Sequence, residues 1–171
     1  MASKNKSLEN KSPGGKLPEK KSSKKKSFSR HARIRARRSA VQALYQLAMS
    51  DIPIQDVINE FVSERSELKK ADTDYFKEIL SGTAKEGVNL DKLLAPLLDR
   101  TIDDLDPIEK AILHIGLYEL TFHPELPYRV VLNEAVDLAK MFGAEQSHKY
   151  INGVLDKAAQ KIRTAEMKRV S

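Results

Sequence analysis

The sequence of 171 residues contains no cysteine, no tryptophan and no long apolar run. Without cysteine the chain cannot form disulfides, thiolate metal sites or a thiol nucleophile, which suits a reducing compartment such as the cytoplasm. No apolar run approaches the roughly 20 residues that span a bilayer, and the charged N-terminus lacks the apolar stretch of a signal peptide. We therefore expect a cytoplasmic protein with no membrane segment.

The residue patterns of metal, nucleotide and catalytic sites are also missing. The four histidines have no ligand spacing such as i, i+4, so we expect no metal site. The adjacent glycines Gly14 and Gly15 do not follow a predicted strand, which disfavours a phosphate-binding loop. Asp103, Asp104 and Glu109 precede or open a predicted helix, where carboxylates favour the helix dipole. We prefer helix capping to acid–base catalysis for them, a partner surface stays open, and we expect no catalytic residue and no cofactor.

The net charge of +6 is the sum of two unlike parts. Residues 1–38 carry 14 Lys or Arg and only two acidic residues, a charge of +12. The remainder, residues 39–171, carries −6 and has the usual size of one domain. The chain is therefore a basic N-terminal segment joined to a mildly acidic body.

Residues 1–29 are rich in Lys, Ser, Pro and Gly and poor in apolar side chains. Such a segment cannot bury enough surface to offset its ordering entropy, so we expect a disordered tail. It either keeps the protein dissolved or adds contacts to phosphate groups, and both interpretations stay open. We place the helical domain at residues 30–163 and a short C-terminal tail at residues 164–171.

Apolar side chains recur at helical spacing through the body, and no strand-type alternation of any length is present. The fold class is therefore all-α, with about seven helices joined by short loops. Asp106-Pro107 is one of the cleaner start signals, because an N-cap residue precedes a proline at the first helical position. The predicted helices cover about residues 33–49, 54–62, 75–84, 90–98, 108–121, 129–142 and 147–162.

Five arginines crowd the start of the first predicted helix. The helix dipole disfavours cations there, so their placement costs stability and indicates an anionic partner. Arginine pairs bidentately with phosphate and stacks on bases, which favours a nucleic acid. Charge alone does not distinguish RNA from DNA. The candidate nucleic-acid-binding residues of this cluster are Arg30, Arg33, Arg35, Arg37 and Arg38.

Aromatic rings next to such a cluster are candidates for stacking on single-stranded RNA. Tyr45 lies on the arginine-rich helix, and Phe142 and Tyr150 lie further along the chain. For any one ring taken alone, packing in the core is the more frequent role.

A polar stretch from Gly143 to Tyr150 separates the last two predicted helices. It places polar side chains at a helix N-terminus, where free backbone N–H groups bind phosphate. An ordinary capping turn explains the stretch equally well. The candidate residues are Gln146, Ser147, His148, Lys149 and Tyr150.

Several segments in this order resemble the NusB family of bacterial transcription antitermination proteins, over about residues 31–163. The C-terminal segments are long and specific. The segments are Arg37–Gln46 (RRSAVQALYQ), Glu109–Leu113 (EKAIL), Tyr118–Leu120 (YEL), Val131–Lys140 (VLNEAVDLAK), Phe142–Glu145 (FGAE) and Asn152–Asp156 (NGVLD).

The resemblance implies an all-helical fold of two small bundles and a protein that is not an enzyme. It implies binding to the boxA sequence of nascent RNA together with the ribosomal protein NusE. In that family the complex joins RNA polymerase and other Nus factors, so that ribosomal RNA operons are transcribed through terminators.

The resemblance also assigns roles to residues of this chain. The RNA-binding arginines fall on Arg33, Arg35 and Arg37, with Tyr45 on the same helix, and a second RNA patch falls on residues 146–150. A partner surface for NusE includes Asp103 and Glu109. Ile34, inside the arginine run, and Gln146, where an acidic residue is common, depart from the family pattern.

Two other functions were weighed against this one. The first is a NusB-like RNA-binding module associated with a ribosomal RNA methyltransferase, but such chains carry a glycine-rich cofactor loop and a nucleophilic cysteine. The second is a purely structural helical adaptor, which does not explain why arginine replaces lysine in residues 30–38. A homodimer stays open, because a helical face buried against a second copy has the pattern of a core face.

Overall fold

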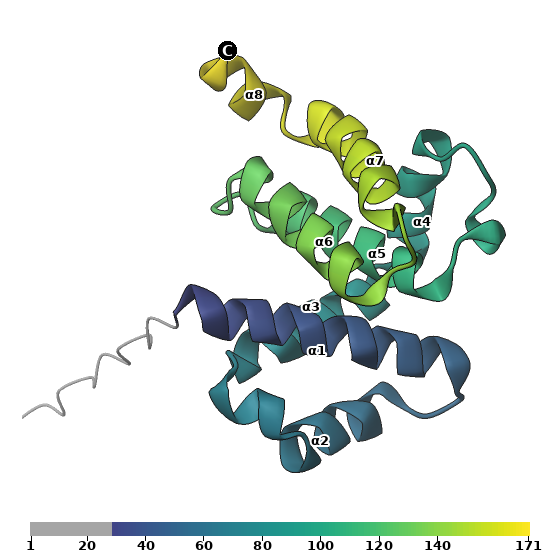
Figure 1. Ribbon diagram of the computed structural model, residues 1–171, viewed down its shortest axis with the longest axis vertical. Coiled ribbons are helices and arrows are strands. Elements are labelled where there is room, and N and C mark those ends of the chain that lie inside the picture. Colours follow the sequence, from purple (N-terminus) through teal and green to yellow (C-terminus); the bar gives the residue numbers. More distant parts are fainter. Residues whose placement is uncertain (1–28) are drawn as a thin grey trace, which may run out of the picture.

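The computed structural model describes residues 29–171, and within that range all regular structure is helical (Figure 1). Eight α-helices are present in this range, joined by short loops and three 3-10 turns. The α-helices are α1 (Arg30–Met49), α2 (Ile54–Glu64), α3 (Thr73–Lys85), α4 (Gly87–Leu94), α5 (Pro107–Phe122), α6 (Tyr128–Phe142), α7 (Ser147–Ile162) and α8 (Thr164–Val170), and the 3-10 turns are η1 (Ser66–Lys70), η2 (Ala95–Leu97) and η3 (Ile102–Asp104).

The all-α prediction is confirmed, and seven of the helices correspond to predicted ones. The eighth, α8, occupies the segment that we expected to be a C-terminal tail. Pro96 lies in the 3-10 turn η2 instead of inside a helix, because its ring cannot continue the α-helical hydrogen bonds. The predicted disordered tail lies outside the described residues, except for Ser29 at its end.

Side-chain caps fix where three of the helices begin. Ser29 Oγ accepts a hydrogen bond from the backbone N–H of Ala32, so α1 starts before the arginine cluster. Asp72 caps α3 in the same way, and Asp106 accepts bonds from two N–H groups in the first turn of α5. Each such cap stabilises a helix by about 1 kcal/mol.

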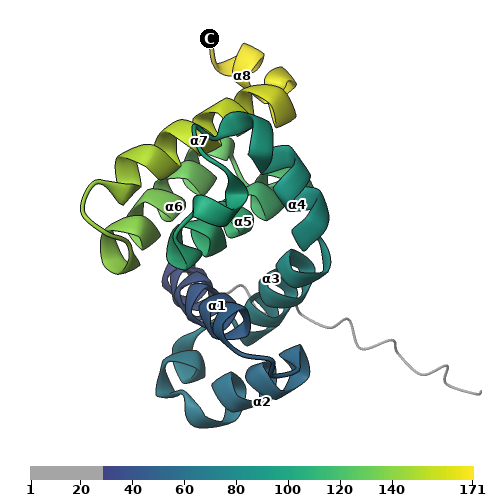
Figure 2. The ribbon, with the colours of Figure 1, turned by 90° about the vertical axis from the view of Figure 1, so that its right-hand side faces the viewer.

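The helices form two small bundles that meet at α1 and α5. Helices α1, α2 and α3 pack together at one end, and α5, α6 and α7 pack together at the other (Figures 1 and 2). Helices α1 and α3 both contact α5, so α5 belongs to both groups. This arrangement confirms the expected pair of bundles.

Helix α5 is the centre of the fold. Every residue from Ala111 to Leu120 is buried, which agrees with apolar side chains around most of its circumference. At Gly116 a Cβ atom would lie 2.7 Å from a methyl carbon of Leu155, so a larger residue there would require the buried Leu155 side chain to shift. No helix within residues 29–171 is long and apolar enough to cross a bilayer.

The C-terminal end of α5 is held by Arg163, which precedes α8. Its buried guanidinium donates hydrogen bonds to the carbonyl oxygens of Leu120 (2.7 Å), His123 (2.8 Å) and Leu126 (2.9 Å). It also pairs with the carboxylate of Glu166 on α8 at 2.6 Å. These bonds satisfy carbonyl groups that a helix end leaves without partners.

His123, at the end of α5, lies between two carboxylates. Its Nε2 is 2.7 Å from Glu78 Oε1, and its Nδ1 is 2.6 Å from Glu125 Oε1. A neutral imidazole has only one N–H donor, so both bonds need the protonated ring. Burial alone would lower the pKa of His123, but the bonds to Glu125 and Glu78 outweigh it and raise the pKa above 6.5.

This arrangement predicts a pH-dependent contribution to stability. A raised pKa in the folded state stabilises the fold below the unfolded pKa, and the contribution is lost as the pH rises through the folded value. We expect His123→Gln to lower the free energy of unfolding more at about pH 6 than at about pH 9. Urea denaturation of both proteins at the two pH values measures this difference. A loss of the same size at both would show that His123 is neutral in the fold.

Candidate nucleic-acid interface

Helix α1 carries its arginines on two different faces. Residues three, four or seven apart share a face of a helix. Arg30, Arg33 and Arg37 therefore form one face, which points toward α3, α5 and α6. We call it the inward face. The outward face follows α1 on another side and consists of Arg35, Arg38, Gln42 and Tyr45.

Arg37, on the inward face, is buried among polar groups of other helices. Its side chain is 4% exposed, and its Nε donates a 2.7 Å hydrogen bond to Glu119 of α5. The hydroxyl of Tyr75 in α3 donates to the same carboxylate oxygen, and Glu134 of α6 lies 4.0 Å from the Arg37 guanidinium. Burial opposes the charge of Arg37, but Glu119 raises its pKa, so it stays a cation.

The structure therefore does not support the predicted contact of Arg37 with RNA. Its guanidinium has no surface to offer a phosphate, because Glu119 and Glu134 already surround it. In the sequence Arg37 is one of five closely spaced arginines, and their spacing alone does not show that its side chain is buried.

The other inward arginines are accessible but also have partners in the protein. The guanidinium carbon of Arg33 lies 4.4 Å from the centre of the Tyr75 ring, and its Nε is 3.8 Å from Asp72 Oδ2. Arg30, with 76% of its side chain exposed, reaches Glu134 at 3.4 Å. Both can still contact an anion, because the side chains of Arg30 and Arg33 stay 76% and 38% exposed.

On the outward face, Arg35 and Arg38 line a hollow of about 320 Å³. Gln42 continues the hollow along α1, and Glu67 of η1 lies at its edge. The opposite wall comes from Met141 and Phe142 at the end of α6. The end of α6 therefore borders the two arginines of α1 that form no side-chain hydrogen bond or ion pair within residues 29–171.

A second hollow of about 390 Å³ follows along the same face. It shares Gln42 with the first and is lined further along by Tyr45, which is 41% exposed. Most of its remaining surface is apolar, from Met49, Ile52 and Ile108. A flat aromatic ring beside two arginines has the composition of a surface that stacks bases and binds phosphates.

The turn between α6 and α7 starts directly after this wall. At Gly143 a Cβ atom would lie 2.7 Å from the carbonyl oxygen of Ala139, so glycine is required where the chain leaves α6. Gln146 then adopts a left-handed conformation with φ of 70°, the only positive φ within residues 29–171. Such a conformation costs a non-glycine residue about 1 kcal/mol or more and is concentrated at functional sites.

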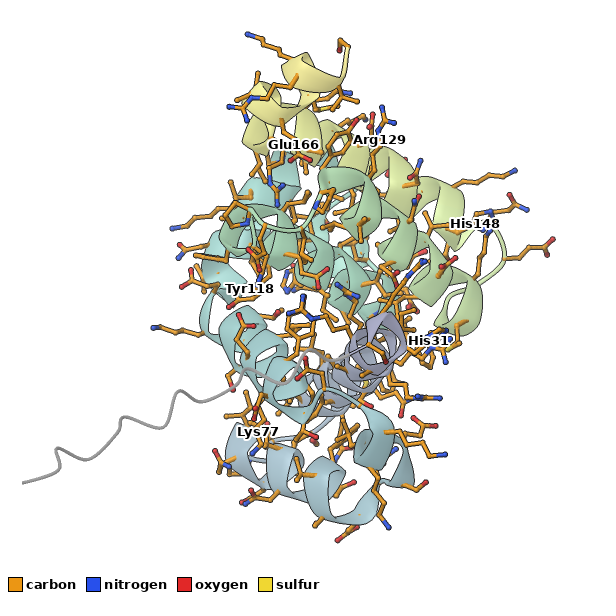
Figure 3. The ribbon with its side chains drawn as sticks, turned by 90° about the vertical axis from the view of Figure 1, so that its left-hand side faces the viewer. His31, Lys77, Tyr118, Arg129, His148 and Glu166 are labelled. Atoms are coloured by element: carbon orange, nitrogen blue, oxygen red, sulfur yellow. The ribbon has the colours of Figure 1, made fainter. Side chains whose placement is uncertain are left out.

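His148 and Lys149 lie in the first turn of α7, which contains no acidic residue and has no side-chain cap. Lys149 is exposed and His148 is half-buried. Figure 3 shows His148 and His31 of α1 on the same side of the molecule, with Lys77 of α3 on the other. The turn and the start of α1 therefore face the same way.

Ser147 differs from its neighbours because it is buried. Its hydroxyl donates a 2.6 Å hydrogen bond to Glu109 Oε1 in the first turn of α5. The prediction that Ser147 contacts RNA is corrected accordingly, since this residue holds α7 against α5. Because of this hydrogen bond, Glu109, which we predicted to contact NusE, also supports the turn between α6 and α7.

Tyr150 packs beneath Arg100, a residue that the sequence did not single out. The Arg100 guanidinium lies 4.3 Å from the centre of the Tyr150 ring and pairs with Asp99 at 2.9 Å. Burial raises the pKa of the Tyr150 hydroxyl, which stays neutral. Arg100 comes from a loop 50 positions away with no periodic signal, so only the fold reveals this contact.

Asp103 is exposed at η3 and lines a hollow of about 270 Å³ between α1 and α5. Lys110 and His114 contribute polar groups to it, and Leu44 and Ala48 contribute apolar surface. Asp103 and Glu109 therefore both lie near the start of α5. Asp103 lines the hollow between α1 and α5, whereas Glu109 contacts Ser147 of α7. Within the described part of the chain, no three His, Asp or Glu residues are placed to hold a metal ion.

Comparison with known proteins gives matches in both sequence and structure. Residues 34–160 match the NusB family. The transcription antitermination protein NusB of Pectobacterium carotovorum subsp. carotovorum (strain PC1) is 51% identical over 132 residues, which cover 77% of this chain and 94% of the relative. T. maritima NusB has a similar structure, with a TM-score of 0.67 and 26% identity over 74% of this chain and 89% of that one. A complex of antitermination factors NusB and NusE with dsRNA shares the fold, with a TM-score of 0.65 and 23% identity over 78% of this chain and 99% of that one.

The two faces of α1 predict opposite effects of two similar substitutions. Arg37→Met leaves Glu119 buried without a counter-charge, so we expect a loss of about 3–5 kcal/mol in the free energy of unfolding. Arg35→Met, the control on the outward face, should change it by no more than about 0.5 kcal/mol. Chemical denaturation measures both. Equal stability of the two variants would contradict the assignment of Arg37 to the interior.

Proposed function

This chain belongs to the NusB family, and we propose from that premise that it is a transcription antitermination factor. It binds boxA RNA of ribosomal RNA operons together with the ribosomal protein NusE. The complex acts in the cytoplasm with RNA polymerase and other Nus factors and helps the polymerase read through terminators.

The observation that carries the RNA part of this proposal is the outward face of α1. Arg35 and Arg38 lie beside a hollow that adjoins a second one containing Tyr45. Guanidinium groups suit phosphates, and an exposed ring suits an unstacked base. The outward face therefore offers both kinds of contact along one helix.

The turn before α7 supplies the second part of the surface. Gln146, His148 and Lys149 present polar groups beside the end of α6, which forms the far wall of the arginine hollow. Uncapped N–H groups of the helix add to the attraction for phosphate. We assign these three residues and Tyr150 to RNA, with Arg30 and Arg33 at the other end of the surface.

The partner part of the proposal rests on charge. Residues 39–171 carry a net charge of −6, which suits a basic ribosomal protein. Asp103 and Glu109 near the start of α5 are the residues that we assign to NusE.

The methyltransferase-associated module is the less favoured function. This chain covers 94% of a relative whose name is transcription antitermination protein, so the similarity extends over nearly that whole protein. Near the start of α5, Asp106 caps the helix, Asp104 accepts a hydrogen bond from Thr101, and Glu109 accepts one from Ser147.

Replacing both outward arginines tests the RNA surface. We expect Arg35→Ala with Arg38→Ala to weaken boxA binding by about tenfold or more, because two charged phosphate contacts are lost. The slope of log affinity against log salt should fall by about 1.4, since each contact to single-stranded RNA contributes about 0.7. Fluorescence anisotropy with labelled RNA at several salt concentrations gives both quantities.

The control for this variant is Lys77→Ala with Lys85→Ala, which removes two exposed cations from α3. It should bind boxA RNA like the wild type. If the arginine variant kept wild-type affinity, or if both variants lost the same amount, the outward face would not be the RNA surface.

Two substitutions near α5 test the partner surface. Asp103→Lys should weaken NusE binding about threefold to tenfold, mainly through slower association, because it reverses a charge that faces a basic partner. Glu109→Gln should weaken it less while leaving an acceptor for the Ser147 hydroxyl.

Surface plasmon resonance with immobilised NusE measures both rates. Glu64→Lys, at the exposed end of α2, is the matched control and should bind normally. Wild-type binding by Asp103→Lys would remove this residue from the partner surface.

A further inference from the structure

We propose that the RNA surface continues along α7, where Lys149, Lys157 and Lys161 bind phosphates of the RNA that flanks boxA. We call these residues the lysine row. The inference rests on the proposed function, because it extends the surface that begins at the turn before α7. Its ligand is the sugar–phosphate backbone, without a requirement for base sequence.

The lysine row follows from the geometry of α7. Lys149, Gly153, Lys157 and Lys161 are spaced by four residues, so successive members are neighbours on the helix surface, and the row winds gradually around α7 by about 40° at each step. Lys149 and Lys157 are separated by about 12 Å along the axis, and Lys161 lies about 6 Å further. The row therefore begins at the proposed RNA site and runs away from it for most of the length of α7.

The row borders a hollow rather than a flat surface. Lys149, Gly153 and Lys157 line a hollow of about 230 Å³, together with Tyr150 and Asp99. A Cβ atom at Gly153 would meet nothing within 4 Å, so the glycine leaves open space between the two lysines. A chain of phosphates and sugars has room to lie along this side of the helix.

Charges on α7 are arranged in a way that costs stability in the absence of an anion. His148 and Lys149 occupy a helix N-terminus, where the dipole favours negative groups. Lys157 and Lys161, four residues apart, repel each other and cost a few tenths of a kcal/mol, although the dipole favours Lys161 in the last turn. Phosphates along the row would relieve both effects.

The nearby carboxylates are already engaged. Asp99, at the hollow, pairs with Arg100 at 2.9 Å, and Asp156 accepts a 2.9 Å hydrogen bond from Gln160. None of the three lysines of the row forms an ion pair within residues 29–171, where Lys110 is the only lysine that does. Arg100, held over the Tyr150 ring, adds a fourth cation beside the hollow.

The experiment compares the full chain with Lys157→Ala plus Lys161→Ala, which leaves the turn and the outward face intact. Four labelled RNAs are used in the presence of NusE: boxA alone, boxA with uridine tracts on both sides, and a scrambled version of each. The matched control is Lys77→Ala with Lys85→Ala, which removes two exposed lysines from α3. Circular dichroism and thermal unfolding check that each variant is folded.

For the wild type we expect the flanking tracts to raise affinity about fivefold at low salt, through added phosphate contacts. The α7 variant should lose most of this gain, and its salt slope on the flanked RNA should fall by about 1.4. Its affinity for boxA alone should change less than about twofold, because Lys157 and Lys161 lie beyond the core site. The α3 control should behave like the wild type.

The outcomes separate the two proposals. A full gain from the flanking tracts in the α7 variant, an equal loss in the α3 control, or no gain in the wild type would overturn the role of the lysine row. A wild type that binds scrambled RNA as well as boxA would overturn the proposed function. The effect of the flanking tracts is measured on boxA and on the scrambled sequence. A protein that did not prefer boxA could therefore still show whether the lysine row binds the flanking RNA.

Discussion

The fold depends on one buried ion pair, between Arg37 of α1 and Glu119 of α5. It joins the two bundles at the place where they meet, and Tyr75 of α3 and Glu134 of α6 complete it. Four helices from both bundles therefore converge on a single guanidinium. A buried pair of this kind adds little net stability over apolar packing, but loss of one partner leaves an uncompensated charge. Its main effect is to fix how α1 is rotated against α5.

That rotation decides what the rest of α1 can do. With Arg37 turned inward, Arg35 and Arg38 are directed outward by helical geometry alone, and Tyr45 follows on the same side. The hollow beside the arginines is closed by the end of α6, so the turn into α7 adjoins it. A structural contact and a proposed RNA surface thus share one helix. Carboxylates of other helices and loops partly offset the cost of placing several cations at the start of α1.

Much of this could be predicted from the sequence, because it depends on local rules. Helical periodicity located seven helices, and the cap at Asp106 set the start of α5 correctly. What the sequence could not show were contacts between distant segments. Periodicity alone does not reveal which face of α1 meets a carboxylate, so Arg37 was assigned to RNA, and Ser147 was assigned likewise although Glu109 holds it. No sequence pattern singled out Arg100, because it is an isolated arginine in a loop. Only the fold shows that it lies over the Tyr150 ring.

The measurement that tests the account most directly is a titration of boxA RNA into the protein with NusE, followed by the NMR signals of the arginine Nε–H groups. All arginines of α1 are observed at once, so each one serves as a control for the others. The account predicts that the Arg37 signal is protected from solvent exchange and stays unchanged, because its Nε donates to Glu119. The Arg35 and Arg38 signals should shift with added RNA. A shift at Arg37 with none at Arg35 or Arg38 would contradict the division of α1 into an inward and an outward face.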